Sequence, residues 1–424
     1  MKIITDFHLH SKYSRATSRD MDLEHIFQAA QERGINVVGT GDFTHPEWFK
    51  ELKNKLEPAE EGLYKLKDQE GEKKALDKNQ DLTRFIVTGE ISNIYTRNGK
   101  GRRVHNLIVL SSLDAAEKIS NILSWQGNIK SDGRPILGMD SEELLKIVME
   151  SDPQALFIPA HIWTPWFGVL GSMSGFDSLE DAFGENIKYL AALETGLSSN
   201  PLMNWRLSSL DDFALVSNSD AHSPQNLGRE ANVFDIELNY SAISEAIKKK
   251  DPSKFLYTIE FFPEEGKYHY DGHRLCQTRM SPQETKEVKG ICPKCGKKLT
   301  VGVLSRVDEL ADREMGFKPQ NIIPYKSLVP LPEIIAEALG VKSRTKTVIE
   351  HYKKLIEKFS NEFNILLDVS LQDLSAFTLP EIAQGIEKVR KGDLIIEPGY
   401  DGEFGKVKIF QEGEQKIVSQ DKLF

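Results

Sequence analysis

The chain has 424 residues, of which 39% are hydrophobic and 28% are charged, a composition typical of a globular protein with about two to four domains. Its 54 Lys and Arg residues and 64 Asp and Glu residues give a net charge of −10, which argues against nonspecific nucleic-acid binding, because affinity for phosphates comes from basic side chains. No apolar run approaches the roughly 20 residues of a membrane span, and the first residues show no targeting segment. We therefore expect a cytoplasmic protein with no membrane partner.

The first half of the chain alternates short strands with amphipathic helices. A strand is predicted at residues 2–5. Apolar residues from Leu23 to Ala30 then repeat at the spacing of a helix, which Gly34 ends. Further strand-like runs, each beside polar residues, lie at Ile35–Val38, Phe85–Val87, Leu107–Leu110, Leu156–Ile158, Leu190–Leu193 and Leu215–Val216. This alternation predicts an α/β fold with a parallel sheet closed into a barrel, whose active site lies at the carboxyl ends of the strands.

The chain is predicted to contain four parts. The barrel spans residues 1–262 and carries a charged insertion at residues 57–80. Because the insertion has few apolar anchors, we expect a solvated helical hairpin there, with a lid as the alternative. After the barrel we expect a Cys-bearing, short-stranded part at 263–318 (the Cys module), a helical module at 319–378 and a small C-terminal β module at 379–424.

Three cysteines lie close together in the Cys module. In a cytoplasmic chain, this clustering favours metal binding over disulfides. Cys292-Pro-Lys-Cys295 has the form of a zinc-ribbon turn. His273 precedes Cys276 by the same two-residue gap, which makes it a better fourth ligand than His269. Because four protein ligands fill a tetrahedral site, we predict one structural zinc ion.

Side chains of metal-ligand type also recur beside the predicted strands of the barrel. They are His8, His10, Asp42, His45, Glu90, His105, His161, Glu194, Asp220 and His222. Two pairs, His8 with His10 and Asp220 with His222, stand two residues apart on a strand end and can point to one face. Imidazole and carboxylate ligands together suit zinc, manganese or iron. A single buried histidine is explained by hydrogen bonding alone, but the whole set predicts a metal site.

His105 precedes its apolar run, so we place it at the start of a strand or on the bend before it. Glu194 is predicted either to bind metal or to support a residue that does.

The motifs His8-Leu9-His10, Asp42, Glu90, His105, His161 and Asp220-Ala221-His222 resemble the PHP (polymerase and histidinol phosphatase) superfamily of phosphoesterases. The resemblance covers residues 1–260 and implies a distorted β/α barrel with two or three divalent ions of Zn, Mn or Mg. It implies that the catalytic ligands are His8, His10, Glu90, His105, His161, Asp220 and His222. Clustered ions of this kind make a hydroxide from bound water and neutralise the phosphate, so no general base residue is required.

The chain departs from the superfamily pattern at two positions. Gly41-Asp42-Phe43 stands where the family usually has Thr-Asp-His, and His45 would have to supply the missing ligand. Ala16 and Thr17 stand where many members have a His or an Asp, and Asp20 is the nearest carboxylate.

The order of the modules, with the stretches at 161–166, 268–273 and 397–402, is similar to the endonuclease Q family of archaeal and bacterial DNA-repair enzymes. This resemblance implies a cut on the 5′ side of a deaminated base (uracil, hypoxanthine or xanthine) or of an abasic site. One pocket with backbone N–H donors could accept several flipped deaminated bases, because deamination replaces an amino donor by a carbonyl acceptor. The partner would be damaged DNA, and the location the cytoplasm, in association with the nucleoid.

Two groups of residues are candidates for contact with DNA. Three aromatic residues that follow His161 could stack on a base, although packing in the core explains them equally well: Trp163, Trp166 and Phe167. Tyr95 and a basic stretch close to Glu90 could lie along the DNA backbone, although a solvated loop is the alternative: Arg97, Lys100, Arg102 and Arg103.

Three further hypotheses stay open. The chain could be a small-molecule PHP phosphatase of the histidinol-phosphate type, or a DNA-binding scaffold with a degenerate barrel. The last residues, 420–424, resemble the start of a sliding-clamp-binding peptide but lack its second aromatic residue. Packing of this tail on the protein is the alternative to clamp binding.

Overall fold

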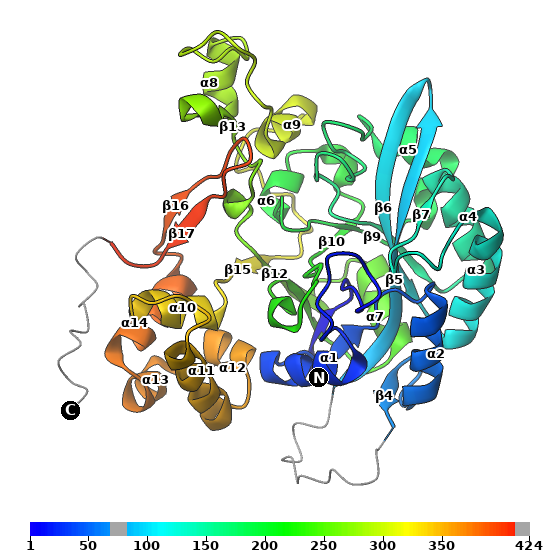
Figure 1. Cartoon of the computed structure of the whole chain (residues 1–424), viewed down its shortest axis with the longest axis horizontal. Helices are drawn as coiled ribbons and strands as arrows, with labels where there is room; N and C mark the ends of the chain where they lie inside the picture. The colour runs from blue at the N-terminus through cyan, green and yellow to red at the C-terminus, as the bar shows by residue number, and fades with distance from the viewer. Residues whose placement is uncertain (68–82, 412–424) are drawn as a thin grey trace.

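The computed structural model describes residues 1–67 and 83–411, and Figure 1 shows their arrangement. The central sheet is built on β1 (Lys2–Asp6), which pairs in parallel with β2 (Val37–Gly39). Strand β2 pairs in parallel with β5 (Arg84–Arg97). On the other side of β1 follows β11 (Ala231–Asp235), which is antiparallel both to β1 and to the next strand, β12 (Phe255–Glu260). The predicted α/β class is confirmed.

The sheet curls into a distorted barrel through β6 and β8. Strand β6 (Lys100–Leu110) is antiparallel to both β5 and β8 (Leu156–Pro159). A parallel pair, β9 (Ala192–Glu194) and β10 (Ala214–Val216), continues the curvature. Isolated bridges join Phe157 to Leu190 and Leu9 to Ala221, which links this pair to β8 and to the chain after β1.

The long β5–β6 hairpin corrects the expected position of His105. This residue lies in the middle of β6, opposite Ser92, not at the start of a strand. The sequence Gly101-Arg102-Arg103 resembles a loop, but its pairing with β5 extends the strand back to Lys100. Cross-strand hydrogen bonding therefore overrides the polar composition of this segment.

Helices cover the outside of the barrel, as Figure 1 shows for α3 and α4. They are α1 (Leu23–Arg33), α2 (Pro46–Lys55), α3 (Leu113–Gln126), α4 (Ser141–Ser151) and α7 (Tyr240–Lys248), with the short helices α5 (Leu179–Phe183) and α6 (Pro201–Asn204). Helix α1 begins at the Asp22 cap, whose side chain accepts the His25 N–H, and ends at Gly34 with a left-handed φ of 93°. Its apolar face, which includes Leu23 and Ile26, packs into the main core.

The charged insertion differs from the expectation. Its described part forms the antiparallel strands β3 (Leu56–Pro58) and β4 (Tyr64–Leu66), and β4 joins the sheet at Tyr64 opposite Phe85. The predicted helical hairpin is therefore wrong for this part. Leu63 and Tyr64 are buried and supply the apolar anchors that favour sheet pairing. Residues 68–82 lie outside the described part of the chain.

The Cys module projects from the barrel beside the C-terminal hairpin (Figure 1). Its elements are β13 (Asp271–His273), β14 (Thr278–Met280), α8 (Pro282–Glu287) and α9 (Val303–Leu310), and it is followed by β15 (Tyr325–Ser327), which pairs with β12. Arg306 of α9 donates hydrogen bonds to the carbonyl oxygens of Leu170 and Phe176. Arg313 forms an ion pair with Asp211. These bonds attach the module to the loops that follow β8 and precede β10.

Five helices follow the Cys module in the described part of the chain, which ends at residue 411. They are α10 (Leu331–Ala338), α11 (Lys346–Phe359), α12 (Glu362–Leu367), α13 (Leu371–Phe377) and α14 (Pro380–Lys391). Helix α14 lies in the range assigned to the β module, and Ile382 and Ile386 bury one face of it in the core that α10 shares. The ion pair between Arg33 and Glu362 joins α12 to α1.

The described chain ends in a small hairpin of β16 (Ile395–Glu397) and β17 (Lys406–Lys408). Tyr400, between these strands, bridges to Tyr270 of the Cys module. Residues 412–424, which include the sequence compared with a clamp-binding peptide, lie outside the described residues. None of the described helices has the length and apolar character needed to cross a membrane.

Candidate metal centre

The ligand-type side chains converge at one end of the barrel. His8 and His10 follow β1, His161 follows β8, and Asp220 and His222 follow β10, while Glu90 and His105 face each other from the β5–β6 hairpin. Three residues of this region have left-handed backbones, with φ of 48° at Asp42, 31° at His161 and 47° at Asp220. Non-glycine residues adopt this conformation at an energetic cost, and such strain gathers at functional sites.

His8 is held so that one ring nitrogen faces the interior of the cluster. Its Nδ1 lies 3.0 Å from Glu194 Oε2. Its Nε2 lies 3.6 Å from Glu90 Oε1 and 3.7 Å from Asp220 Oδ1, and it is buried with no hydrogen-bond partner among the described residues. Glu194 also accepts the His161 N–H at 2.9 Å and an Asn218 amide bond at 2.9 Å. Glu194 therefore orients His8, which is the supporting role that the sequence left open.

His10 is oriented in the same manner by Asp42. Its Nδ1 lies 3.1 Å from Asp42 Oδ1, and its Nε2 lies 3.1 Å from Asp220 Oδ1. The other oxygen of Asp42 accepts the N–H and hydroxyl of Ser11 and the hydroxyl of Ser14. The structure thus places Asp42 behind His10, where the sequence predicted a metal ligand. A carboxylate in this position fixes the ring tautomer and raises the basicity of the ligating nitrogen.

A second group of ligands surrounds Glu90. Its Oε1 lies 2.8 Å from His105 Nδ1 and 3.0 Å from His161 Nε2, and these two nitrogens are 3.3 Å apart. At this distance the lone pairs of two neutral imidazole nitrogens would repel each other unless a proton or a metal cation lay between them. The other oxygen of Glu90 lies 3.4 Å from His10 Nε2. Glu90 therefore stands between the two groups of histidines.

His222 lies at the edge of the cluster. Its ring centroid is 4.5 Å from that of His10, and its Nδ1 is 2.9 Å from the carbonyl oxygen of Asp220. The side chain is 30% exposed, whereas that of His10 is fully buried. His222 is thus placed at the mouth of the site.

The electrostatics of the cluster favour bound positive charge. Burial opposes ionisation of Glu90, but His105, Arg134 and His8 more than offset this and hold the pKa of Glu90 well below its usual range. Burial lowers the pKa of His8, but the carboxylates of Glu194 and Glu90 reverse the effect and raise it. At His105, burial prevails and lowers the pKa to about 4. The raised pKa of His8 shows that the surrounding carboxylates favour a positive charge at this position, which a divalent ion can supply in place of the proton.

The donor set fits a metal centre of more than one ion. His8, His10 and Asp220 have ligand atoms within 4.8 Å of one another, and so do Glu90, His105 and His161. The unpartnered Nε2 of His8 points toward both carboxylates. Nitrogen and carboxylate ligands at this spacing suit divalent transition metals, with a carboxylate able to bridge.

Two residues predicted as substitute ligands lie elsewhere. His45 caps α2, its Nε2 lies 3.2 Å from the carbonyl oxygen of Lys130, and its ring stacks on Tyr13 at 4.5 Å. Asp20 is exposed, whereas the clustered ligands are buried or partly buried. The structure brings neither residue into the two ligand groups. His45, two residues past Phe43, lies at the N-cap position of α2, which turns its side chain away from the ligand groups.

Arg134 is part of the site and was missed by the sequence analysis. Its Nη1 donates to Glu90 Oε2 at 3.0 Å, and its side chain is 27% exposed at the mouth of the barrel. Glu90 and Asp220 raise the pKa of Arg134 against the effect of burial. The residue stands in a Gly- and Pro-containing loop between predicted elements, and no spacing rule connects it to Glu90.

The candidate DNA-contacting residues fall into two classes. Trp163 is fully buried, and its Nε1 donates to Asn204 Oδ1 at 2.8 Å. Trp163 therefore packs in the core, which was the alternative to a contact with DNA. Arg97 is bound by Asp140 and Glu142. The ring of Phe167 lies 4.4 Å from that of His105, and Arg102 lies over the ring of Phe176. Lys100, Arg103 and Trp166 are exposed to solvent, and Tyr95, Arg97, Arg102 and Phe167 are partly exposed.

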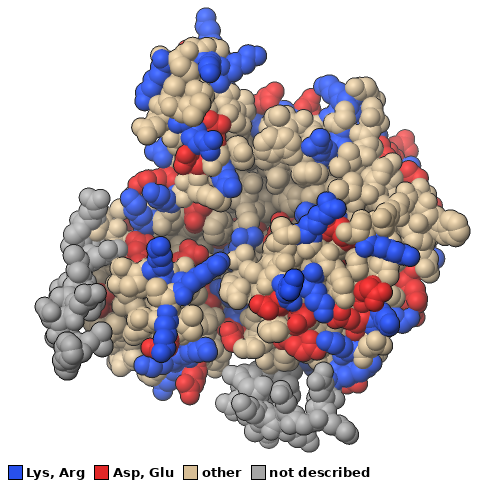
Figure 2. Space-filling view, viewed as in Figure 1, with Lys and Arg blue, Asp and Glu red and all other residues tan. Residues whose placement is uncertain are grey.

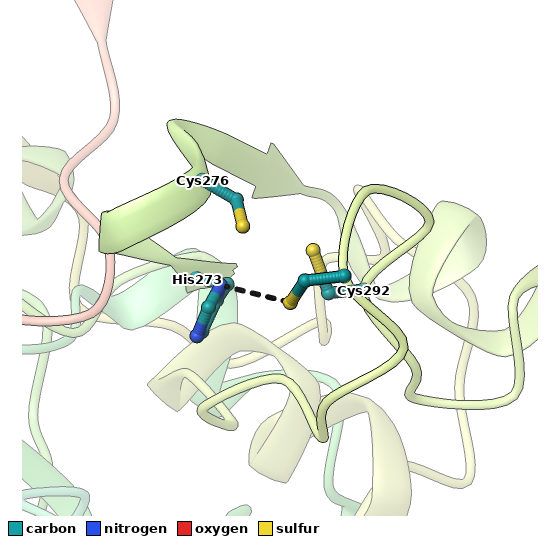
Figure 3. A group of neighbouring side chains, drawn as sticks. His273, Cys276 and Cys292 are labelled. Carbon is teal, nitrogen blue, oxygen red and sulfur yellow. Dashed lines mark hydrogen bonds between the residues drawn. The ribbon is translucent and has the colours of Figure 1, made fainter.

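The Cys module contains a separate ligand group (Figure 3). His273, Cys276, Cys292 and Cys295 have ligand atoms within 4.8 Å of one another, and Cys295 Sγ lies 3.6 Å from His273 Nδ1. His269 instead stacks on Tyr270 and is buried. The structure therefore brings His273, not His269, to the three thiols. Three thiols and one imidazole form a closed donor set for structural zinc.

Comparisons with known proteins agree with this architecture. A family model described as the MJ0043 C-terminal domain matches residues 330–393, the region of α10 to α14. The uncharacterized protein MJ0043 of Methanocaldococcus jannaschii is 36% identical over 253 residues, which cover 58% of this chain and 31% of that protein. The chain thus spans about a third of the length of that relative.

Two solved structures match nearly the whole chain. The lesion-specific endonuclease PfuEndoQ from Pyrococcus furiosus is 32% identical with a TM-score of 0.84, and the match covers 97% of this chain and 96% of that one. Endonuclease Q in complex with a 27-mer duplex substrate, with an abasic lesion at the active site, is 32% identical with a TM-score of 0.82, covering 97% and 98%. The chain therefore belongs to the endonuclease Q family of nucleases.

Proposed function

We propose that the protein is a metal-dependent DNA endonuclease that hydrolyses the phosphodiester on the 5′ side of a deaminated base or an abasic site. The observation that carries the proposal is the pair of ligand groups around Glu90 in a chain whose full length matches a lesion-specific endonuclease. The abasic lesion at the active site of a relative supports damaged DNA as the substrate class. Extension to uracil, hypoxanthine and xanthine rests on the shared carbonyl acceptor of these bases.

The residues of the chain have distinct roles in this reaction. His8, His10, Glu90, His105, His161 and Asp220 would hold two or more divalent ions, with His222 at the mouth. Such ions lower the pKa of a bound water and neutralise charge on the phosphate. Glu194 and Asp42 fix the rings of His8 and His10 so that each presents Nε2 to the site. Positioning of this kind preserves ligand geometry during the reaction.

Arg134 is proposed as a positioning residue. Its bond to Glu90 Oε2 holds that carboxylate between the two histidine groups and balances part of its charge. The guanidinium has five donors in a planar fork, and the partly exposed side chain can present others to a phosphate at the mouth. Arginine is well suited to that task because its geometry matches phosphate oxygens.

Basic side chains gather locally despite the negative net charge. Figure 2 shows Lys and Arg on the Cys module and on the C-terminal helices, with a hollow in the face between the Cys module and the barrel. Such patches can neutralise the backbone of a bound DNA. A zinc ion at His273 and the three cysteines would keep the Cys module folded. Cytoplasmic, nucleoid-associated location and clamp binding stay predictions from the sequence.

The proposal is tested with a panel of duplexes in Mg²⁺ or Mn²⁺. Each duplex carries one uracil, one hypoxanthine, one abasic site or no lesion, and a phosphomonoester is assayed in parallel. We expect a single cut at the 5′ side of each lesion and no cut in the intact duplex. Equal cutting of undamaged DNA, or turnover of the phosphomonoester alone, contradicts the proposal and favours a general nuclease or a small-molecule phosphatase.

A further inference from the structure

A cavity of about 420 Å³ lies along the β5–β6 hairpin, whose strands also carry Glu90 and His105. Its lining includes Ile94, Thr96, Arg103, Trp166, Met173 and Ser174. We propose that this cavity is a subsite for an undamaged nucleotide that neighbours the lesion, with its base on Trp166 and its phosphate on Arg103. The proposal rests on the endonuclease function proposed above and goes beyond it by naming where the substrate strand continues.

The register of the hairpin connects the cavity to the metals. Arg103 and His105 lie two residues apart on β6, so their side chains point to the same face. Their backbone positions are about 7 Å apart, a distance that one nucleotide unit spans. Phe167 fills the space between them, because its ring lies 4.4 Å from the His105 ring and 6.0 Å from the Arg103 guanidinium. A strand cut at the metals therefore passes the cavity within one nucleotide.

The wall of the cavity opposite the hairpin is a fixed loop. His105 N–H donates to Phe167 O at 2.9 Å, and Arg103 N–H donates to Ser174 O at 3.4 Å. Trp166 packs against Tyr268 of the Cys module, with ring centroids 5.5 Å apart and planes at 72°. Trp166 is nevertheless 37% exposed and Met173 is 62% exposed. An aromatic ring and a thioether thus stand open to solvent on a rigid support.

The chemistry of the lining favours a neighbouring nucleotide over the lesion itself. Discrimination of a damaged base needs buried polar groups that are left unpaired by the wrong base. Tyr95 and Arg102 also line the cavity, but they form a cross-strand pair whose side chains point to the other face of the hairpin. On the face of Arg103, the cavity offers stacking on Trp166, apolar contact with Ile94 and Met173, and the charge of Arg103. Stacking on an aromatic ring tolerates any base, since every base has a π-face. The cavity therefore suits a neighbouring nucleotide with any of the four bases.

The first test asks whether Arg103 contacts one particular phosphate of the substrate strand. Neutral methylphosphonates are placed one at a time at the phosphates flanking a uracil, and single-turnover cutting is measured for wild type, Arg103→Ala and Lys118→Ala. Loss of one good phosphate contact should slow wild type about tenfold at one neighbouring phosphate. Arg103→Ala should be slow already and insensitive at that same phosphate. Lys118→Ala, which removes an exposed charge on α3, should behave as wild type.

The second test separates the neighbouring base from the lesion base. Trp166→Ala should weaken binding about tenfold, as stacking losses do, and equally for uracil and abasic duplexes, while Trp166→Phe should restore most of it. A 2-aminopurine beside the lesion should be quenched by wild type and not by Trp166→Ala. Thermal melting checks that the variants are folded.

The outcomes are distinct. If wild type cuts the lesion duplex but Arg103→Ala changes the methylphosphonate effect at no flanking phosphate, the subsite is overturned and the proposed function stands. If Trp166→Ala impairs uracil duplexes but not abasic duplexes, the cavity holds the lesion base and the inference is wrong. If wild type cuts no lesion duplex, the proposed function fails and the subsite fails with it.

Discussion

The two metal-ligand groups of this protein are built in opposite ways. In the barrel, ligands from His8 to His222 come from separate strands, are mostly buried, and are oriented by further carboxylates. In the Cys module, all four ligands lie between His273 and Cys295, on short turns, and one thiol is exposed. The barrel would therefore position ions for reaction, whereas the Cys module would depend on its ion for its fold.

The two sites also differ in what holds their ligands in place. The barrel ligands lie on a sheet supported by two large hydrophobic clusters, so we expect the barrel to keep its fold without the ions. The Cys module has short elements and little core of its own, and zinc-binding free energy in such modules is folding free energy. Removing a ligand should therefore abolish reaction in the barrel and structure in the Cys module.

The largest effect is expected for Asp220→Ala. This residue belongs to the group with His8 and His10, and its loss removes charge that holds a divalent ion. We expect single-turnover cutting of a uracil duplex to fall about 10³-fold or more, because a catalytic ion contributes several kcal/mol. The melting temperature should stay close to that of wild type. Asp212→Ala, which removes an exposed carboxylate before β10, should keep wild-type activity. A variant that cuts normally would remove Asp220 from the site.

Cys292→Ser is expected to act on structure first. Cys292 is buried at 1% exposure within the four-ligand group. The variant should retain about one zinc ion fewer by elemental analysis and should be cleaved by proteases within the Cys module, because structural zinc sites supply folding energy. Lys298→Ala in the same module should resist proteolysis. An equally resistant Cys292→Ser protein would show that the module folds without metal.

Glu194→Gln is expected to have an intermediate effect. The substitution keeps the shape of the side chain but weakens the charged contact with His8 Nδ1. Loss of such a supporting carboxylate should lower metal affinity about 10- to 100-fold, measured by titration of metal-free protein with Mn²⁺. Cutting at saturating Mn²⁺ should recover most of its rate. An unchanged metal affinity, equal to that of the surface variant Glu245→Gln, would contradict the supporting role.

Arg134→Ala should reduce cutting about tenfold, the loss expected for one charge-assisted hydrogen bond. Because the Arg134 side chain contacts Glu90 and is partly exposed, the fold should be unaffected. Arg134→Lys keeps the charge without the planar fork and should be intermediate. Equal activity of all three proteins would show that Glu90 needs no such partner.

The smallest effect concerns Glu260 and pH. Burial raises the pKa of this carboxyl to about 7, and hydroxyls of Thr258 and Thr195 bond to it. The native state then binds more protons than the unfolded state between about pH 4.5 and 7, so stability falls as pH rises through this window. Glu260→Gln should be more stable than wild type at pH 8 by about 1–3 kcal/mol. The difference should vanish near pH 4.5, and a pH-independent difference would contradict the raised pKa.

The sequence predicted a large part of the fold and of the site, for physical reasons that differ between regions. The ligand group of the Cys module was predictable because Cys276, Cys292 and Cys295 lie close together in the sequence, where local turns can bring their thiols together. The barrel pattern followed from apolar runs ending in polar residues, although the β5–β6 hairpin was not expected because its basic residues do not reveal cross-strand pairing. The insertion strands depend on contact with β5, which is also invisible in local sequence.

Other parts of the site could not be predicted from the sequence. Whether a carboxylate binds metal or orients a histidine depends on angles at the strand end, which separate Asp42 from Asp220 although both follow a strand. Arg134 reaches Glu90 from a loop with no spacing signal. The exposure of Trp166 and the burial of Trp163 are set by the packing of the loop against Asn204 and the Cys module.

The most direct test follows cutting and barrel occupancy together. Metal-free protein is titrated with Mn²⁺, and bound metal and 5′-side cutting of a uracil duplex are measured at each step for wild type and for a His8→Ala, His105→Ala double variant. The account predicts that cutting rises with occupancy of the barrel sites in wild type, while the double variant neither binds these ions nor cuts. Full lesion-dependent cutting by the double variant would contradict it.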